Sequence, residues 1–212
     1  MKANTTLLTA LQMEGIRDAR VMQAFGRVAR GGFVPRGVEP EADLDRPVPI
    51  GRGQVTTQPS LIARMVEALE LRGGERVLEI GTGFGYQTAI LAELAREVVS
   101  IERFADIAGQ ATVNLRAAGY GPARVRVVVG DGTLGAPEWA PYAAIIVAAA
   151  APAVPPPLIE QLAEGGRLVQ PIGPAGDDEV ICFARQGGSL RRVRRLCHAY
   201  FVPLIGRHGL AR

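Results

Sequence analysis

The stretch that decides the fold reads VLEIGTGFGYQ and spans Val77–Gln87. Its first four residues, Val77–Ile80, have the apolar character of a buried strand, and glycines follow at alternate positions. A run compatible with a helix then begins at Tyr86. Glycines are needed where the backbone takes positive φ or lies close to a ligand, and the helix N-terminus offers free N–H groups. The stretch therefore predicts a strand, a tight turn and a helix that together bind a nucleotide.

Strands and helices alternate after residue 76. The expected strands are Val77–Ile80, Val98–Glu102, Val125–Val129, Ala144–Ala149 and Gly166–Ile172, and the expected helices are Tyr86–Ala95, Ala105–Ala118 and Pro156–Ala163. Two further strands, Glu179–Arg185 and Leu190–Leu196, flank a Gly-Gly pair and predict an antiparallel pair that closes the sheet edge. Near-continuous apolar strands between amphipathic helices indicate a parallel sheet covered on both faces. We therefore predict an α/β, Rossmann-like, doubly wound fold with a mostly parallel seven-stranded sheet.

The first 70 residues follow another pattern. Apolar spacing predicts helices within Thr6–Arg30, with Gly15 between two of them, and over Ser60–Leu69, where Pro59 suits the first turn. Arg36–Gly53 is rich in proline, glycine and charge, so we expect it to be irregular but ordered. Residues 1–70 are thus expected to form an N-terminal helical lobe within the same domain as a ligand-binding core over 71–212.

Composition limits the class of protein. No uncharged apolar run reaches the roughly 20 residues that span a bilayer, so we expect no membrane association. Two cysteines, Cys182 and Cys197, make no disulfide framework and favour a cytoplasmic protein with reduced thiols. The cysteines, His198 and His208 lack the spacing of metal ligands, so no metal is expected. The net charge of +3 neither requires nor excludes a nucleic-acid partner.

The glycine spacing indicates which nucleotide is bound. A dinucleotide site needs G-x-G-x-x-G, whereas this chain has G-x-G-x-G with Glu79 two residues before the first glycine. A carboxylate there disfavours a phosphate and suits a ligand with a cationic end, such as S-adenosylmethionine. Glu79 is expected to order the turn or to meet that cationic end rather than to do chemistry.

Two further strand ends fit the same cofactor. Glu102 lies about twenty residues beyond the first glycine, where an acid accepts hydrogen bonds from ribose hydroxyls. Asp131, in a Gly-Asp-Gly sequence, is placed to accept from the adenine amino group, and its glycines would admit the ring. The residues expected to bind S-adenosylmethionine are Glu79, Gly81, Thr82, Gly83, Gly85, Tyr86, Glu102, Arg103, Asp131 and Gly132.

The methyl acceptor is suggested by what the fourth strand lacks. The segment after it, Val147–Pro152, has no polar and aromatic pair that could hold an exocyclic amine. The pattern also places no cysteine or histidine near the crevice, because Cys197 and His198 fall in the late strands. An ionised acceptor such as a carboxylate needs no base, only positioning and removal of water. A hydroxyl in Pro47–Pro59 could hold that carboxylate.

Seven motifs resemble those of the protein-L-isoaspartate O-methyltransferase family. They are Phe33–Pro35, Pro47–Pro59, Val77–Ala89, Ser100–Arg103, Gly130–Gly132, Ala150–Gly173 and Phe201–Gly206. They cover nearly the whole chain, and the second and last are specific to that family. The resemblance implies methyl transfer from S-adenosylmethionine to the free α-carboxylate of L-isoaspartyl residues in damaged proteins and peptides. It implies S-adenosylhomocysteine as the second product, and a methyl ester that cyclises to a succinimide without the enzyme. The expected partners are these substrates, with no nucleic acid, and the oligomeric state stays open.

The resemblance also assigns an active-site residue. The family's serine falls on Thr57, which keeps the hydroxyl, and Val55-Thr56 replaces the usual Thr-Ile. Thr57 is therefore expected to be catalytic. The residues expected to bind substrate are Val55, Thr56, Thr57, Gln58, Pro59, Ala150 and Pro203.

Two alternatives stay open at this point. A basic cluster at Arg191, Arg192, Arg194 and Arg195 would suit a tRNA methyltransferase, although arginines also protect strand edges. The threonine in place of serine would suit a non-catalytic S-adenosylmethionine-binding module.

Overall fold

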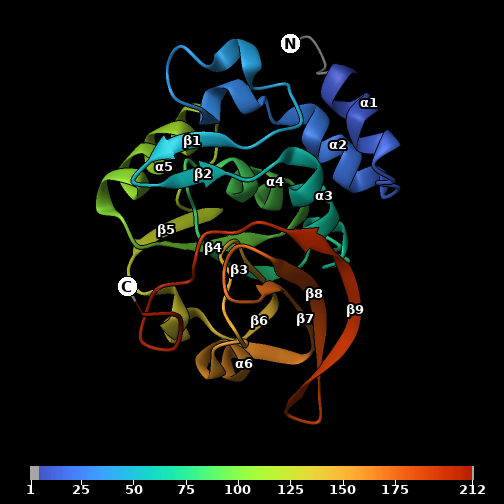
Figure 1. Cartoon of the computed structure of the whole chain (residues 1–212), viewed down its shortest axis with the longest axis vertical. Helices are drawn as coiled ribbons and strands as arrows, with labels where there is room; N and C mark the ends of the chain where they lie inside the picture. Colours follow the sequence, from blue (N-terminus) through green and yellow to red (C-terminus); the bar gives the residue numbers. More distant parts are fainter. Residues whose placement is uncertain (1–4, 212) are drawn as a thin grey trace.

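The computed structural model describes residues 5–211, and its centre is a seven-stranded sheet (Figure 1). The strand order is β5-β4-β3-β6-β7-β8-β9. The bounds are β3 Arg76–Ile80, β4 Glu97–Glu102, β5 Val125–Val129, β6 Tyr142–Val147, β7 Leu162–Ile172, β8 Asp178–Gln186 and β9 Ser189–Ala199. Strands β3 to β7 pair in parallel, whereas β8 is antiparallel to both β7 and β9. The predicted fold class and the antiparallel closing pair are confirmed.

The chain order reverses beside β3. It runs outward from β3 through β4 to β5 and then returns to β6 on the other side of β3. The end of β3 is tied to both neighbours, because Gly81 N donates to Ile101 O at 2.8 Å and Ala148 N donates to Ile80 O at 2.8 Å. A reversal of this kind opens a crevice at the carboxyl ends of the strands, where ligands bind in open α/β sheets.

Alternation along β3 divides the core between the two sheet faces. Val77 joins the hydrophobic cluster that includes α4 (Tyr86–Leu94), and Leu78 joins the cluster on the opposite face. The remaining helices of the core are α5 Ala105–Ala117 and α6 Pro156–Gln161. The last predicted strand of the parallel set starts earlier than expected. Helix α6 ends at Gln161, and β7 begins at Leu162 rather than at Gly166.

The N-terminal helices share this core. They are α1 Thr5–Met13, α2 Ala19–Arg27 and α3 Pro59–Glu67, and their buried faces lie in one cluster with Ile90 and Leu91 of α4. Asp18 caps α2 by accepting from the N–H groups of Arg20 and Val21. Short 3-10 helices complete the set at Arg30–Phe33, Glu39–Glu41, Gly132–Leu134 and Pro137–Trp139. None of the helices in the described part of the chain is long and apolar enough to cross a membrane.

The expectation of an irregular segment up to residue 53 is wrong at its end. Val48–Gly51 forms β1, which pairs antiparallel with β2, Gln54–Thr56. The turn between them places Gly51, Arg52 and Gly53 at φ of 93°, 53° and 69°. Glycine adopts such angles without strain, so the G-R-G sequence permits the tight reversal. Figure 1 shows this hairpin between the N-terminal helices and the sheet.

Candidate active site

The glycine turn after β3 has the conformation that the spacing predicts. Gly81, Gly83 and Gly85 have φ of 95°, 56° and 95°. A Cβ at Gly81 would lie 3.3 Å from Ala148 Cβ, and one at Gly85 would lie 3.0 Å from Leu115 Cγ. Gly85 is also the N-cap of α4. The turn therefore requires glycine for both its dihedral angles and its close packing.

Glu79 lies beneath the turn and lines neither of the cavities described below. It is fully buried and accepts from Gln87 Nε2 at 2.9 Å, Thr88 Oγ1 at 2.5 Å and Ser100 Oγ at 2.5 Å. Burial raises the pKa of this carboxyl to about 7, although the three hydrogen bonds oppose the shift. Glu79 thus links β3 to β4 and α4 through hydrogen bonds. These contacts are those of a residue that orders the turn, the first of the two roles expected for it.

Glu102 reaches the small cavity beside the turn. Its Oε2 accepts from Gly83 N at 3.0 Å, and its Oε1 accepts from Phe104 N at 3.1 Å. Thr82 lines the same cavity, but its Oγ1 is hydrogen-bonded to Ser100 Oγ at 2.6 Å. The guanidinium of Arg103 lies 4.8 Å from the centre of the Phe104 ring. Glu102 is therefore the acid of the predicted set that faces the cavity.

Tyr86 belongs to the same lining but is anchored elsewhere. Its buried ring packs against Phe25 and Phe33, with centroids 6.0 and 5.9 Å apart. Its hydroxyl has no hydrogen-bond partner among residues 5–211. The sequence does not single out the next residue, Gln87, yet it lines the cavity, and its Oε1 is a buried acceptor without a partner in the described chain. That acceptor suits the ammonium or hydroxyl donors of the predicted cofactor.

Asp131 and Gly132 do not line this cavity. Asp131 Oδ1 accepts from Thr133 N and Oγ1, and Oδ2 accepts from Arg207 N at 2.7 Å. Burial raises the pKa of Asp131, but these hydrogen bonds outweigh it and hold the pKa below the ordinary value. A Cβ at Gly132 would overlap Ile80 Cγ2, so this position needs glycine for its close packing against Ile80.

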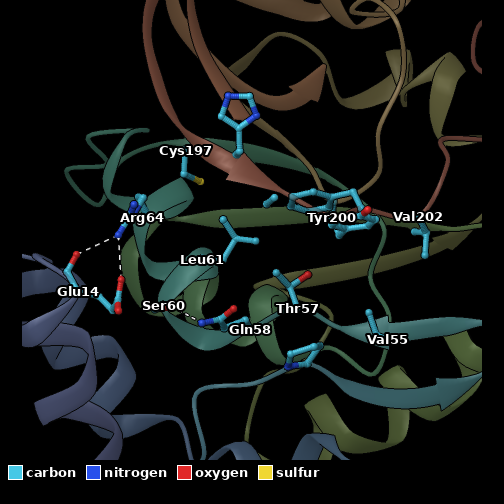
Figure 2. A pocket seen from close by; sticks show the side chains of 15 residues that line it. Glu14, Val55, Thr57, Gln58, Ser60, Leu61, Arg64, Cys197, Tyr200 and Val202 are labelled. Carbon is cyan, nitrogen blue, oxygen red and sulfur yellow. Dashed lines mark hydrogen bonds and ion pairs between the residues drawn. The ribbon is translucent and has the colours of Figure 1, made fainter. Parts of the chain in front are cut away.

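Thr57 lines two adjoining cavities. The larger has a volume of about 540 Å³ and lies over α3 and the end of β9, and the smaller lies at the glycine turn. Four residues line both: Val55, Thr57, Ala148 and Val202. Figure 2 shows Thr57 in the middle of the larger cavity, between Leu61 and Val55. A group held by Thr57 would therefore face the glycine turn.

The neighbours of Thr57 have structural contacts. Thr56 is buried, and its Oγ1 accepts from Arg30 Nη2 at 2.7 Å. Gln58 lines the larger cavity while donating to Asp45 Oδ2 at 2.9 Å, and Pro59 is buried as the first residue of α3. Val55, Thr57 and Gln58 thus reach the larger cavity, whereas Thr56 and Pro59 lie outside its lining.

Arg30 is a site residue that the sequence pattern does not reveal. It is fully buried, and its guanidinium donates to five acceptors on the segment that carries Thr57: Ala42 O, Leu44 O, Arg46 O, Thr56 Oγ1 and Thr57 O. The only sequence signal was an arginine within a run expected to be helical. It did not reveal that this side chain is turned inward.

The structure does not bring Ala150 and Pro203 to either cavity. Ala150 is buried, and it exchanges backbone hydrogen bonds with Val202 O and Leu204 N, at 2.8 and 2.7 Å. Pro203 is exposed. The C-terminal segment lies beside the end of β6, and the flanking Ala148 and Val202 provide the lining instead.

The expectation that no cysteine or histidine lies near the crevice is wrong. Cys197 and His198 line the larger cavity together with Tyr200, because the end of β9 reaches across to α3 (Figure 2). Among residues 5–211, no three His, Cys, Asp or Glu side chains gather as metal ligands would. Of the four arginines on β9, Arg192 and Arg195 are paired with Glu179 at 3.0 and 3.1 Å, as in a protected edge strand.

Comparisons with known proteins agree on one family. The family model for protein-L-isoaspartate(D-aspartate) O-methyltransferase matches residues 1–209. A protein-L-isoaspartate O-methyltransferase of Methanoculleus marisnigri is 50% identical over 94% of this chain and 89% of its own length. One of Methylorubrum populi is 48% identical over 97% of this chain and 95% of its own.

Solved structures resemble the whole chain as well. One named protein-L-isoaspartate O-methyltransferase has a TM-score of 0.86 and 28% identity, over 97% of this chain and 67% of its own. A Plasmodium falciparum protein described as a beta-aspartate methyltransferase, in complex with S-adenosyl-L-homocysteine, shares the fold with a TM-score of 0.82 at 23% identity, over 97% of this chain and 99% of its own. On the family model and these close relatives, the chain belongs to the protein-L-isoaspartate(D-aspartate) O-methyltransferase family.

Proposed function

We propose that this chain methylates the free α-carboxylate of L-isoaspartyl residues in damaged proteins and peptides, with S-adenosylmethionine as donor and Thr57 holding the carboxylate. The observation that carries the proposal is the place of Thr57 in the lining of both cavities. The larger cavity admits the substrate, and the smaller one adjoins the glycine turn. The reaction leaves a methyl ester and S-adenosylhomocysteine, and the ester would then cyclise to a succinimide and begin repair.

The residues at the glycine turn fit this cofactor. Each oxygen of Glu102 accepts one backbone N–H, and a carboxylate has about four acceptor sites, so it can also accept from ribose hydroxyls. Gln87 adds a buried acceptor for a cationic or hydroxyl donor. Neither group suits a phosphate. When bound there, S-adenosylmethionine supplies an electrophilic methyl group.

The chain's own residues then need to do little. An ionised carboxylate requires no base, so the Thr57 hydroxyl has only to donate one hydrogen bond that fixes its orientation. Val55, Ala148 and Val202 line the junction with apolar side chains, which a bound substrate would cover and so remove from water. Arg30 holds the Thr57 backbone through its carbonyl at 3.3 Å and acts as a positioning residue.

Transfer of a labelled methyl group tests the reaction. An isoaspartyl peptide should acquire base-labile label, and the same peptide with ordinary aspartate should not. Thr57→Val should lower kcat/KM by roughly 10- to 100-fold, the value of a hydrogen bond to a charged group, while Thr57→Ser should keep most activity. Binding of S-adenosylhomocysteine, measured by calorimetry, should change little in both variants. Full activity of the valine variant would overturn the role of Thr57.

The same proposal includes a location. The free thiols of Cys182 and Cys197 suit a reducing compartment, so we expect the protein to act in the cytoplasm. Fractionation of the source cells, with antibody detection in the soluble cytoplasmic fraction, tests this.

A further inference from the structure

The larger cavity is longer than the isoaspartyl group that Thr57 would hold. Its floor is one face of α3, on which Arg64 follows Leu61 by three residues and Ser60 by four. At about 1.5 Å of rise per residue, Arg64 lies roughly 10 Å along the segment from Thr57. That distance corresponds to about three residues of an extended peptide. Figure 2 shows Arg64 and Thr57 on opposite sides of Leu61.

The far end of the cavity holds an ion pair between Arg64 and Glu14. Arg64 Nη2 contacts the Glu14 carboxylate at 3.2 Å and the Glu14 carbonyl oxygen at 3.0 Å. The two side chains are 32% and 50% exposed, and an ion pair this open to solvent contributes little to stability. A carboxylate from a bound peptide could therefore take the place of Glu14 at little cost.

A second cavity continues beyond this ion pair. It has a volume of about 280 Å³ and shares Glu14 and Arg64 with the first, and Arg194, Arg195 and Glu67 also line it. Glu67 is already engaged, since its Oε1 accepts from Arg17 N and Asp18 N at 2.8 and 2.7 Å. Arg195 is paired with Glu179, whereas Arg194 has no carboxylate within ion-pair distance among residues 5–211. The two cavities together thus lead from Thr57 to a region lined by three arginines and two glutamates, in which Arg64 is held by an exposed ion pair and Arg194 by none among residues 5–211.

We propose that Arg64 is a specificity-determining residue that binds an acidic side chain of the substrate, located within about three residues of the isoaspartyl group, in place of Glu14. This inference rests on the proposed function, because it concerns the peptide that carries the methylated carboxylate. It adds a preference: substrates with a nearby Glu or Asp are bound better than neutral ones, and substrates with Lys there are bound worse. Arg194 strengthens the preference from the second cavity.

A matched set of isoaspartyl peptides tests the preference. They differ only in carrying Glu, Gln or Lys at one of the three positions on either side of the isoaspartyl residue. At one or more positions, the wild-type enzyme should show a KM about fivefold lower for Glu than for Gln, with similar kcat. The difference should shrink as ionic strength rises from 0.02 to about 0.5 M, as expected of charges near a surface.

The variants are read as ratios within each protein, so a general loss of activity does not affect the result. Arg64→Gln should bring the Glu/Gln ratio of kcat/KM to about one, Arg64→Lys should keep part of the preference, and Glu14→Gln should increase it. Arg191→Gln is the matched control, because Arg191 lies on the exposed part of β9 and lines neither cavity, and it should keep the wild-type ratio.

The outcomes separate the two levels of the proposal. An equal KM for the Glu and Gln peptides at all positions, or an unchanged ratio in Arg64→Gln, overturns the role of Arg64 and leaves the methylation intact. Absence of base-labile label on every isoaspartyl peptide overturns the reaction itself.

Discussion

The Glu79 carboxylate lies among three hydrogen-bond donors and away from solvent, so its protonation is linked to folding. Its pKa is about 7 in the folded protein and near the ordinary 4.5 in the unfolded chain. Between these values the folded state holds more protons than the unfolded state. The contribution of Glu79 to the free energy of unfolding therefore falls as pH rises from about 4.5 to 7 and is constant above. A shift of this size corresponds to about 3 kcal/mol.

Glu79→Gln should remove this pH dependence. The amide can still accept from Gln87 and donate to the Ser100 or Thr88 hydroxyl, so the network is kept without a titratable group. Urea unfolding from pH 4.5 to 8 should show the variant gaining stability relative to wild type as pH rises. Glu97→Gln is the control, because the Arg76 hydrogen bond lowers the pKa of Glu97 below its ordinary value, so its linkage to folding lies largely below pH 4.5 and its stability relative to wild type should stay nearly constant over this range. A stability difference between Glu79→Gln and wild type that stays constant with pH would contradict the assignment.

At the scale of elements, the sequence predicts what regular patterns encode. The glycine spacing predicts the β3–turn–α4 unit, and apolar runs predict the sheet, because both depend on local conformation and burial. The sequence does not predict the hairpin β1–β2, because its strands have only four and three residues, too few to show alternation, and β1 contains Pro49. Cys197 and His198 reach the cavity through the path of β9, an 11-residue strand whose pairing has register shifts with β8. No local pattern specifies that path.

Five acceptors in the segment from residue 42 to 57 share one donor side chain, that of Arg30, and this dependence can be tested. Arg30→Met would leave up to five acceptors without their donor, at roughly 1–3 kcal/mol for each one that stays buried. Hydrogen exchange should increase in residues 42–57 and stay near the wild-type level in β3 and β4. Arg30→Lys, with a compact ammonium that cannot span the five acceptors, should give an intermediate effect.

Activity should follow the same order. Methyl transfer to an isoaspartyl peptide should fall more than the affinity for S-adenosylhomocysteine, because the five hydrogen bonds from Arg30 go to residues 42–57, which include Thr57, rather than to Glu102 or the glycine turn. If exchange in residues 42–57 does not change in either variant, Arg30 does not hold the segment.

At the scale of the whole molecule, the two ends of the chain complete the site from opposite sides. The N-terminal helices share a hydrophobic cluster with α4, so the segment carrying Thr57 is packed on the same core as the glycine turn. The C-terminal segment reaches back to the end of β5. There Arg207 N donates to Asp131 Oδ2, and His208 N donates to Thr133 Oγ1 at 3.1 Å. The orientation of Asp131, the expected adenine acceptor, is thus fixed by Arg207, which lies 76 positions later in the chain.

Gly206 allows this contact, and adding a methyl group there tests the predicted role of Asp131. A Cβ at Gly206 would overlap the Asp131 carboxylate, so Gly206→Ala must displace either the carboxylate or the segment. Asp131 has about one acceptor site left after its three hydrogen bonds, enough for an adenine amino group only while its orientation is kept. Calorimetry with S-adenosylhomocysteine should show binding about tenfold weaker, the value of a hydrogen bond to a charged group.

Gly121→Ala is the control, because a Cβ there meets no atom within 4 Å, and its affinity should equal that of wild type. Unchanged affinity in Gly206→Ala, with Asp131→Ala also unaffected, would remove Asp131 from the cofactor site and leave it as a residue that fixes the C-terminal segment.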